Sequence, residues 1–311
     1  MKEIMSLARR VAKTNVTVLV IGESGTGKEL VARAIHDSSN NSHKPFVPFN
    51  CTSVPRDLLE SHLFGHRRGA FTGADRDQVG LIRAARDGTL FLDEIGELSL
   101  DLQPKLLRFL ESGEIAPLGE PGPTHVNVRI VAATNRNLEE LVRAGGFRED
   151  LFYRLNIVRL TIKPLRERRD EIPGFINAFV TRAATEMNRG TLTVSEETMD
   201  RLLLYRWPGN VRQLQNEIVR MVALADTNAT LTPDMISDEI LDALPIFRRS
   251  ASSEHELTVP LHGKLLPTLA QVEREMIQAA LKQHRGKVTA AAKALGISRK
   301  GLYLKRQRYG L

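Results

Sequence analysis

The chain has 311 residues, enough for two or three domains, and its apolar content of 42% and charged content of 26% are ordinary for a globular protein. Its single cysteine, Cys51, excludes internal disulfides and fits a reducing compartment. No apolar run approaches the roughly 20 residues that span a bilayer, and residues 1–15 lack the apolar core of a signal peptide, so we predict a cytoplasmic protein with no membrane partner.

The net charge of +7 is unevenly distributed along the chain. The segment Met276–Leu311 holds nine of the 44 Lys and Arg residues and no acid, which leaves 35 bases against all 37 acids in the remainder. Such a block favours a polyanionic partner, most simply nucleic acid. The alternative is a solvated basic face, but such faces normally interleave acids with bases.

A glycine-rich loop lies between the first predicted strand, residues 16–21, and a helical pattern over 30–35. In this context backbone N–H groups converge on phosphate oxygens and the lysine reaches the β- and γ-phosphates. An ordinary glycine turn is the alternative, and Glu29 stands where a Ser or Thr that contacts Mg²⁺ is expected. The loop consists of Gly22, Glu23, Ser24, Gly25, Thr26, Gly27, Lys28 and Glu29.

A second glycine-rich segment follows a short strand that ends at Asn50. Within a helical pattern over 60–74, glycines bracket Phe71 and Thr72. Because glycine at this density weakens a helix by up to about 1 kcal/mol each, we expect a protruding loop whose Phe71 contacts another protein. The alternative is that Phe71 is buried in the core.

The next predicted strand, 89–92, delivers Asp93 and Glu94 at its carboxyl end. In a parallel α/β sheet this is the edge where ligands bind. One carboxylate can hold Mg²⁺ while the next orients or deprotonates the attacking water, which is what nucleotide hydrolysis needs. Paired acids at a strand end can also be helix caps, but the phosphate loop upstream favours hydrolysis.

Further along, a helix is expected over 99–112 and a loop or hairpin around 121–123. The buried strand that follows, 128–133, ends in Thr134 and Asn135. These side chains can place a hydroxyl or an amide near the γ-phosphate.

Two arginines precede the last predicted strand. Arg148 and Arg154 are six residues apart, so they face different directions on a helix and should have different roles. The alternative to a functional role is that both arginines form local ion pairs with Glu149 and Asp150. A strand over 158–162 then completes a five-stranded, mostly parallel sheet of the α/β class.

Beyond this sheet only helices are predicted, over 172–186 and 195–205 and again after a Trp-Pro-Gly turn. Asn210 and Gln213 form a capping box for this third helix. Arg212 lies in its first turn, next to the positive end of the helix dipole. A nearby anion such as a nucleotide phosphate would resolve this conflict, and so would a salt bridge.

The basic tail follows a predicted linker over 247–264, and a second capping box, Thr268 and Gln271, precedes a helix. An apolar stripe on this helix suits pairing with a twin helix. The stripe consists of Leu269, Val272, Met276, Ala279 and Ala280.

The end of the tail has the pattern of a helix-turn-helix: a small-residue helix over 288–295, a turn at Gly296, and a basic helix capped by Ser298. A random basic helical tail is the alternative. The predicted core of the helix-turn-helix consists of Ala291, Ala292, Leu295, Ile297 and Leu302. Phosphates or base edges would be faced by Arg299, Lys300, Lys305, Arg306 and Arg308.

Through these motifs the chain resembles the bacterial enhancer-binding proteins, the AAA+ ATPases that activate sigma-54-dependent transcription, over nearly all of its length. The phosphate loop matches the Walker A form of this family, including Glu29. One further stretch is identical to the family's sigma-54-contacting loop: Gly69, Ala70, Phe71, Thr72, Gly73 and Ala74.

The resemblance implies a role for each matching residue of the nucleotide site. Asp93 resembles the Walker B acid that binds magnesium, and Glu94 resembles the catalytic base. Asn50 resembles the residue that holds Glu94 inactive until the sigma factor engages. Thr134 and Asn135 resemble sensor I.

The remaining matches imply roles outside a single nucleotide site. Arg148 and Arg154 resemble arginine fingers that reach the γ-phosphate of a neighbouring subunit, and Arg212 resembles sensor II. The tail is similar to the Fis-type DNA-binding domain of the family. Its implied DNA-binding residues are Ser298, Arg299, Lys300, Tyr303, Lys305 and Arg306.

The resemblance also implies an organisation. We expect an AAA+ α/β nucleotide-binding subdomain over 1–163, a helical lid over 164–245, a linker over 246–266 and a helix-turn-helix domain over 267–311. ATP and Mg²⁺ are the implied cofactors. The implied partners are sigma-54 RNA polymerase holoenzyme, upstream double-stranded DNA and further copies of the chain, as a dimer through the DNA-binding domain and a hexamer when active.

Two features depart from the family pattern. Arg67 and Arg68 stand where many members carry an acid and a lysine, and no sensory domain precedes Met1, so we expect either a truncated chain or regulation by a separate partner. Two other functions are compatible with the motifs. One is an AAA+ remodeller with a different substrate, and the other is a DNA-binding repressor whose ATPase fold is a relic. The target genes, the DNA site and the activating signal are not encoded in any motif.

Overall fold

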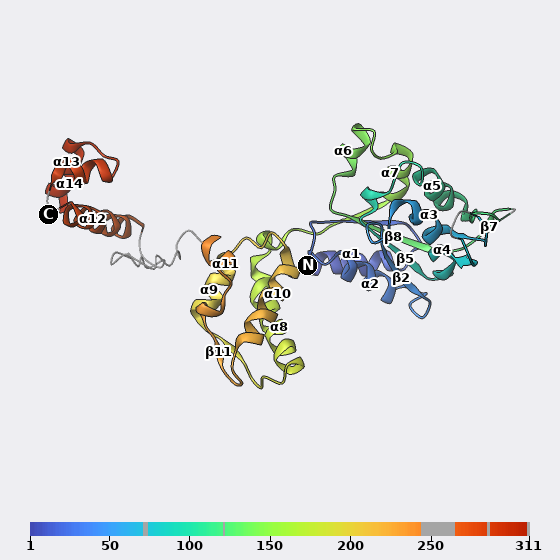
Figure 1. Ribbon diagram of the computed structural model, residues 1–311, viewed down its shortest axis with the longest axis horizontal. Coiled ribbons are helices and arrows are strands. Elements are labelled where there is room, and N and C mark those ends of the chain that lie inside the picture. The colour runs from blue at the N-terminus through green and yellow to red at the C-terminus, as the bar shows by residue number, and fades with distance from the viewer. Residues whose placement is uncertain (71–73, 121, 244–264, 285–286, 310–311) are drawn as a thin grey trace. The chain divides into compact units, whose positions relative to one another are not determined.

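The computed structural model describes residues 1–70, 74–120, 122–243, 265–284 and 287–309 (Figure 1). The chain forms two compact units, 1–246 and 247–311. No helix among the described residues combines the length and the apolar character that crossing a bilayer requires.

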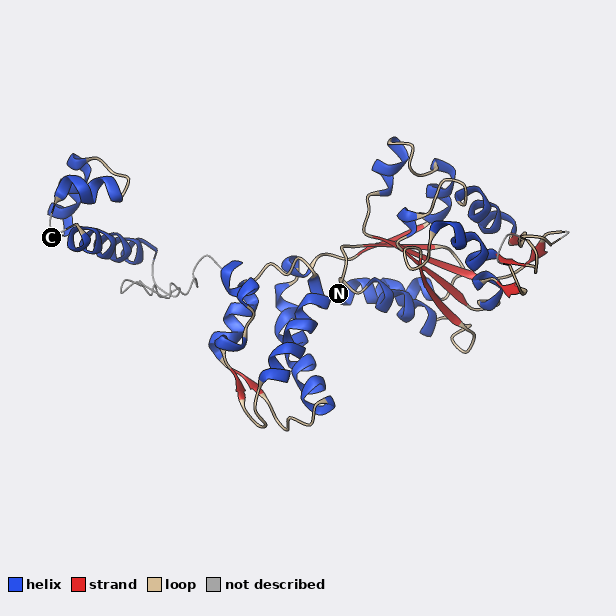
Figure 2. Cartoon of the chain, in the orientation of Figure 1, coloured by secondary structure: helices blue, strands red, loops and turns tan. Residues whose placement is uncertain are grey.

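The first unit contains the predicted five-stranded sheet, in the order β2-β5-β8-β1-β9. All four pairs of neighbours are parallel (Figure 2), so the carboxyl ends of the strands meet at one edge. The fold class is therefore α/β, as predicted. The strands are β1 (Val18–Ile21), β2 (Phe46–Asn50), β5 (Thr89–Asp93), β8 (Arg129–Thr134) and β9 (Val158–Thr161).

Both faces of the sheet are covered, which explains why the three inner strands β1, β5 and β8 are buried almost throughout, whereas the edge strands β2 and β9 are partly exposed. Side chains alternate along β1, so Val18 and Val20 join one core cluster and Leu19 joins the other. The first cluster packs on α1 (Lys2–Ala12) and α2 (Lys28–Asp37). The second packs mainly on α3 (Arg56–Phe64), α5 (Gln103–Ser112) and α7 (Glu149–Leu155), near the shorter elements α4 (Leu81–Ala84), η1 (Ile95–Glu97) and α6 (Leu138–Arg143).

Two antiparallel hairpins extend from the α/β part, formed by β3 (Gly65–His66) with β4 (Gln78–Val79) and by β6 (Glu114–Ile115) with β7 (Thr124–His125). The second confirms the hairpin expected around 121–123. The expected protruding loop lies between β3 and β4, but the helical pattern before it is a real helix, α3, that continues to Phe64. Phe71, Thr72 and Gly73 lie outside the described residues.

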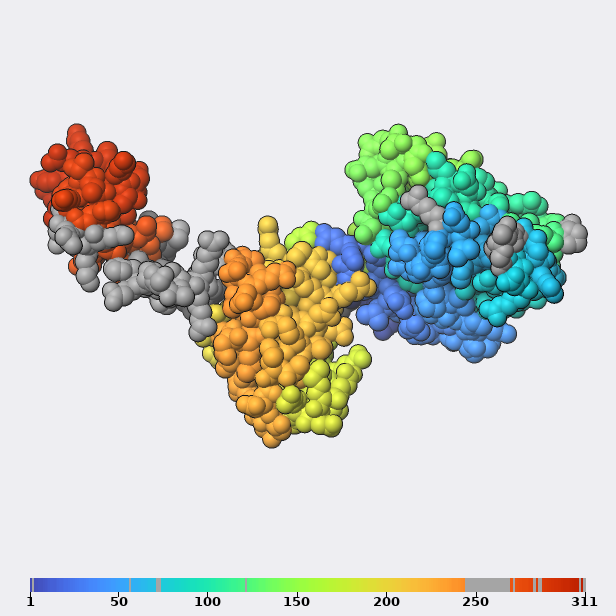
Figure 3. All heavy atoms as spheres, viewed as in Figure 1, coloured from blue at the N-terminus to red at the C-terminus, as the bar shows by residue number. Residues whose placement is uncertain are grey.

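The helical part of the first unit packs around Trp207, which is fully buried. The indole N–H of Trp207 donates to the Leu202 carbonyl at 2.8 Å, and its ring meets Tyr205 edge-on with centroids 5.0 Å apart. In Figure 3 the atoms of this part, yellow-green to orange, form one continuous body. Its elements are η2 (Leu165–Glu167), η3 (Arg169–Glu171), α8 (Ile172–Glu186), β10 (Thr193–Val194), α9 (Glu196–Leu204), α10 (Asn210–Leu224), β11 (Thr230–Leu231), η4 (Pro233–Met235) and α11 (Asp238–Ala243).

The second unit consists of α12 (Leu265–Gln283), α13 (Val288–Ala294) and α14 (Arg299–Tyr309). Its core contains the predicted Ala291, Ala292 and Leu302, all buried, with Leu295 and Ile297 packed against them. The turn at Gly296 has φ +67°, and the Ser298 hydroxyl accepts the Gly301 N–H at 3.0 Å, as expected of a cap.

Three predicted helix starts differ from the structure. The helix expected from Ser99 begins at Gln103, after a turn. The helix expected to be capped by Thr268 begins at Leu265, so Thr268 lies within it. Asn210 does not cap α10, because its side chain contacts other segments. Gln213 accepts the Gly209 N–H at 3.0 Å, one residue before the predicted cap. At Asn210 the side chain forms tertiary hydrogen bonds instead of the helix-capping bond that the local sequence predicts.

Candidate functional site

The glycine-rich loop connects β1 to α2 at the carboxyl edge of the sheet, as predicted. The Gly22 N–H donates to the Thr134 carbonyl at 3.2 Å, which continues the pairing of β1 with β8 into the loop. Gly25 and Gly27 have φ of +77° and +98°, a conformation that favours glycine. Thr26 closes the loop internally, because its hydroxyl donates to the Glu23 carbonyl at 2.7 Å.

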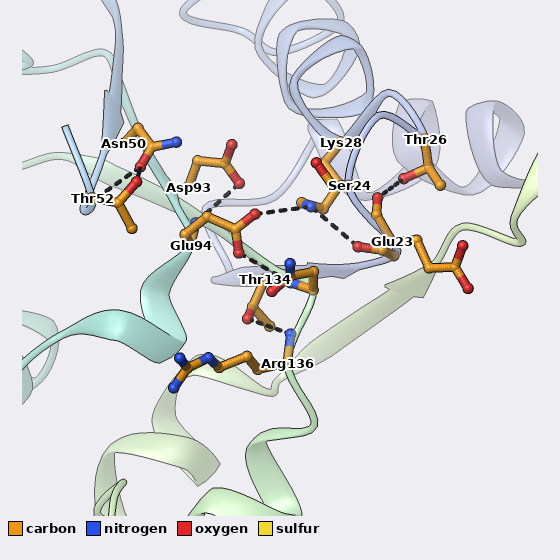
Figure 4. A network of polar contacts seen from close by, with 12 residues as sticks. Glu23, Ser24, Thr26, Lys28, Asn50, Thr52, Asp93, Glu94, Thr134 and Arg136 are labelled. Atoms are coloured by element: carbon orange, nitrogen blue, oxygen red, sulfur yellow. Dashed lines mark hydrogen bonds and ion pairs between the residues drawn. The ribbon is translucent and has the colours of Figure 1, made fainter. Parts of the chain in front are cut away.

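Lys28 is the first residue of α2, and only 6% of its surface is exposed. Its ammonium donates to the Gly22 carbonyl at 3.1 Å and to Glu94 Oε1 at 3.4 Å (Figure 4). The lysine is therefore held between the phosphate loop and Glu94, the predicted catalytic base.

Asp93 and Glu94 are brought together with Lys28 by the end of β5. Burial raises the pKa of the Asp93 carboxyl, and the positive charge of Lys28 opposes this shift. Glu94 has φ +53°, a left-handed conformation that costs of order 1–3 kcal/mol and is typical of functional sites. Its N–H donates to Asp93 Oδ1 at 3.0 Å.

Thr134 and Asn135 end β8 beside these acids. The buried Thr134 hydroxyl accepts the Arg136 N–H at 3.0 Å, while the backbone N–H of Asn135 donates to Glu94 Oε2 at 3.2 Å. Both residues follow the predicted strand as expected, and their predicted approach to the γ-phosphate stays a prediction.

Asn50 lies next to Asp93 in the register of β2 with β5. Its Oδ1 accepts hydrogen bonds from the Thr52 N–H at 2.8 Å and the Thr52 hydroxyl at 2.7 Å. The expected contact between Asn50 and Glu94 is not formed, because Glu94 is engaged by Lys28 and Asn135 instead (Figure 4).

The two predicted arginine fingers have different partners, in keeping with their six-residue spacing. Arg148 precedes α7 and forms an ion pair with Asp150 at 2.7 Å, which is the local pairing considered as its alternative. Arg154 donates instead to the Leu110 carbonyl, with distances of 2.7 and 3.1 Å. Both side chains are exposed.

Arg212 lies in the first turn of α10, and its backbone N–H donates to the Gly25 carbonyl at 3.3 Å. Its side chain is exposed, and none of the ion pairs formed by the described residues includes it. The predicted conflict with the helix dipole is therefore not resolved by a salt bridge.

The base of the loop between β3 and β4 is closed by the Gly69 N–H, which donates to the Ala74 carbonyl at 2.8 Å. Arg67, one of the departures from the family pattern, pairs with Asp77 at 2.6 Å and with Glu120 at 2.9 Å. Glu120 also pairs with Arg83 at 2.5 Å. The Arg67–Glu120 pair joins the two hairpins, and the Arg83–Glu120 pair joins the second hairpin to α4.

In the second unit, Arg299, Lys300 and Tyr303 are exposed on α14, as a DNA-contacting surface requires. The predicted DNA contact of Lys305 stays a prediction, and in this structure its ammonium forms an ion pair with Glu273 of α12. The Tyr309 hydroxyl donates to the same carboxylate at 2.5 Å. Lys305 thus joins two helices within the unit.

The sequence analysis missed a set of contacts behind the phosphate loop. Arg166 pairs with Glu23 at 2.6 Å, Asn210 contacts Glu23 and Ser24, and Arg168 donates to the Thr26 carbonyl at 3.1 Å. No local pattern marks these residues, since each partner is more than 140 positions away.

Comparison with family models matches three segments of the chain. Residues 1–161 match the model described as sigma-54 interaction domain, residues 166–252 an AAA+ ATPase lid domain, and residues 268–309 the Fis family of bacterial regulatory proteins.

Similar proteins include the hydrogenase transcriptional regulatory protein HoxA of Cupriavidus necator, 44% identical over 99% of this chain and 63% of its own length. The DNA-binding transcriptional regulator NtrC of Azospirillum brasilense is 41% identical over 97% of this chain and 66% of its own length. The chain therefore spans just under two thirds of these relatives. A crystal structure of NtrX from Brucella abortus in complex with ADP has a TM-score of 0.75 at 32% identity, and the match covers 100% of this chain and 68% of that one.

Proposed function

Since the chain belongs to the sigma-54 interaction domain family of AAA+ ATPases, we propose that it is a sigma-54-dependent transcriptional activator. In this proposal a ring of subunits, hexameric when active, hydrolyses ATP to remodel sigma-54 RNA polymerase holoenzyme, while the C-terminal unit binds upstream DNA. Such partners place the protein in the cytoplasm. The single observation that carries the proposal is the convergence of Lys28, Asp93 and Glu94 behind a glycine loop of Walker A sequence.

The glycine loop suits a nucleotide. Its backbone N–H groups and the start of α2 offer donors and positive dipole to phosphate oxygens. Lys28 would exchange its present acceptors, the Gly22 carbonyl and Glu94, for β- and γ-phosphate oxygens. That exchange would also release Glu94 Oε1 to accept a proton from the attacking water. Two NtrX structures of the same fold are described as complexes with ADP and with ATP.

Asp93 is the residue that would hold Mg²⁺. Burial raises the pKa of the Asp93 carboxyl. A bound Mg²⁺ would lower this pKa again, because a nearby cation favours the ionised carboxylate. No group of three potential metal-ligating side chains occurs among the described residues, so the remaining ligands would be phosphate oxygens and water, as is usual for Mg²⁺. The ion would neutralise charge that develops on the phosphates.

Arg148 and Arg154 support the ring. Both lie on the surface and away from Lys28's contacts in the same subunit, so a role at the γ-phosphate requires a neighbouring copy. An arginine supplied in trans contributes on the order of a thousandfold or more in rate. Sites completed by a neighbour need head-to-tail contacts that close into a ring. A dimer through the C-terminal unit would pair two copies on upstream DNA.

The experiment that tests the proposal measures sigma-54 promoter opening by the wild type and by Thr72→Ala, with ATPase activity recorded in parallel. We expect the variant to hydrolyse ATP and to fail in promoter opening. Thr193→Ala is the matched control, since its exposed hydroxyl contacts only Thr230 in the helical part. Equal promoter opening by wild type and Thr72→Ala would contradict the activator proposal, as would a wild type that hydrolyses ATP but opens no promoter.

The outcomes also separate the two alternatives. ATP hydrolysis without nucleotide-dependent sigma-54 binding would favour an AAA+ remodeller with another substrate. DNA binding with no ATP turnover at high protein concentration would favour a repressor with a relic ATPase fold.

A further inference from the structure

Three successive carbonyl oxygens of the phosphate loop, those of Ser24, Gly25 and Thr26, accept hydrogen bonds from the residues that follow the sheet. Their donors are, in order, the Asn210 amide at 3.0 Å, the backbone N–H groups of Val211 and Arg212 at 3.0 and 3.3 Å, and the Arg168 guanidinium at 3.1 Å. In a planar trans peptide the carbonyl and the next N–H point in opposite directions. Fixing the Ser24 and Thr26 carbonyls therefore orients the N–H groups of Gly25 and Gly27 toward the phosphate side, whereas the Thr26 N–H donates to the Glu23 carbonyl at 3.3 Å within the loop.

The Glu23 side chain adds an ion pair between the phosphate loop and the residues that follow the sheet. Its two carboxylate oxygens accept two hydrogen bonds from the Arg166 guanidinium, at 2.6 and 2.8 Å, and Oε2 also accepts from the Asn210 amide at 3.1 Å. Arg166 thereby lowers the pKa of Glu23 and keeps it ionised. Figure 4 shows the Glu23 carboxylate turned away from the Lys28 ammonium. A carboxylate in a phosphate loop would repel phosphate, so this side chain serves to attach the loop.

Asn210 connects three segments at once. It is fully buried, its Oδ1 accepts the Leu165 N–H at 2.7 Å, and its amide donates to Glu23 and Ser24. It also adopts φ +53°, which is unfavourable, and gives up a helix-capping bond worth about 1 kcal/mol. The tertiary contacts to the phosphate loop compensate for both costs.

The loop and the start of α10 are also in direct contact. A Cβ added to Gly25 would lie 2.3 Å from the Gly209 carbonyl oxygen. With no space between them, a shift of one backbone requires a shift of the other.

We propose that Glu23, Arg166 and Asn210 form a clasp that orients the phosphate-binding N–H groups and transmits nucleotide binding to the helical part. These are positioning residues, and the proposal rests on the ATPase function proposed above. When phosphates bind the loop, the clasp moves the start of α10 and so the position of Arg212. When the clasp is broken, nucleotide binds but the helical part no longer responds.

Trp207 offers a direct readout, because it is the only tryptophan of the chain, is fully buried and lies three residues before Asn210. The experiment records Trp207 fluorescence as ADP is added, ADP binding by calorimetry, and kcat and KM for ATP. The variants are Glu23→Gln, which keeps the size of the side chain, and Arg166→Lys, which keeps the charge but loses the fork of two donors.

We expect ADP to change Trp207 fluorescence in the wild type. In both variants ADP should still bind, the fluorescence response should largely disappear, and kcat should fall about tenfold, a typical size for coupling between sites. Combining Glu23→Gln with Arg166→Lys should cost little more than either change alone, because the two residues act as a pair. Circular dichroism confirms that each variant is folded.

Glu139→Gln is the matched control. It removes an ion pair of the same 2.6 Å length and similar exposure, between Glu139 and Arg159, but it leaves the phosphate loop untouched. This variant should behave as the wild type. A normal Trp207 response in folded Glu23→Gln, an equal loss in Glu139→Gln, or no response in a wild type that binds ADP would overturn the clasp. A wild type that binds no ADP would instead contradict the ATPase proposal itself.

Discussion

The Lys28 ammonium and the Glu94 carboxylate share a hydrogen bond of 3.4 Å, although 66 residues separate them in the chain. The bond connects the start of α2 to the end of β5, across the place where a γ-phosphate would be bound. The opposite oxygen of Glu94 accepts the Asn135 N–H. Glu94 is thus fixed by two neighbouring elements in a left-handed conformation. In the proposed mechanism its Oε1 becomes available to accept a proton only when Lys28 turns to the phosphates.

Replacing Glu94 by Gln should lower kcat for ATP hydrolysis by about 10²- to 10⁴-fold, the usual contribution of a general base. Nucleotide affinity should be retained, because the phosphate loop and Lys28 are unchanged, although Gln keeps only one acceptor oxygen for the two donors, Lys28 and the Asn135 N–H. Steady-state kinetics and calorimetry would measure the two quantities. Activity within twofold of the wild type would show that another group accepts the proton.

Replacing Asp93 by Asn should raise the stability of the folded chain at neutral pH and abolish ATP hydrolysis. Because burial raises the pKa of Asp93, the folded chain binds this proton more tightly than the unfolded chain, whose Asp pKa is about 3.9. The free energy of unfolding contributed by Asp93 therefore falls as the pH rises through the window above 3.9. At neutral pH the ionised carboxylate costs stability, and Asn removes this cost while its oxygen still accepts the Glu94 N–H.

Thermal unfolding without Mg²⁺ would test this sign. The Tm of Asp93→Asn should exceed that of the wild type at pH 7, and the difference should shrink toward pH 4. ATP hydrolysis should be lost at every pH. A lower Tm of Asp93→Asn at pH 7 would mean that the attraction between Lys28 and the ionised Asp93 stabilises the fold by more than the burial of this charge destabilises it.

Cys51 should resist alkylation in the folded protein. Burial, assisted by the negative charges of Asp93 and Glu94, raises the pKa of its thiol to about 12. At pH 8 the reactive thiolate is then only about one part in ten thousand, whereas an unfolded cysteine with a pKa near 8.5 is about a quarter ionised. We expect iodoacetamide to modify native protein at least about a thousandfold more slowly than protein in guanidinium. Rapid native labelling would contradict the burial of Cys51.

Much of the fold could be predicted because its signals are local. Short apolar runs marked the five strands, and the shared edge of a parallel sheet brought Lys28, Asp93 and Glu94 together. The glycine loop was recognisable because Gly25 and Gly27 adopt conformations that other residues avoid. These features depend on short segments whose physical requirements can be read in the sequence.

The features that could not be predicted depend on distant partners. Asn210 has the sequence of a helix cap, but its amide is used by a loop 186 residues away. Gln103 delays the start of α5 because its buried side chain contacts Leu98, Gly146 and Arg148. Lys305 has the charge of a DNA contact but pairs with Glu273. A local pattern gives the chemical nature of each residue and not its partner.

The different surroundings of Lys300 and Lys305 lead to a prediction about DNA binding. Lys300 is exposed on α14 and should contact a phosphate, whereas Lys305 is paired within the unit. Lys300→Ala should weaken binding to double-stranded DNA and reduce the slope of log K against log salt by about 0.9, the value for one phosphate contact. Lys305→Ala should leave the slope unchanged and instead destabilise the unit by up to about 1 kcal/mol, the range of a partly exposed ion pair.

Fluorescence anisotropy with one DNA duplex at several salt concentrations would measure both slopes, and thermal unfolding would measure stability. Glu273→Gln is the matched control, since it breaks the same ion pair without removing a positive charge. It should lower stability as Lys305→Ala does and leave the salt slope at the wild-type value. A reduced slope for Lys305→Ala would mean that Lys305 exchanges Glu273 for a DNA phosphate, because the carboxylate and the phosphate compete for the same ammonium.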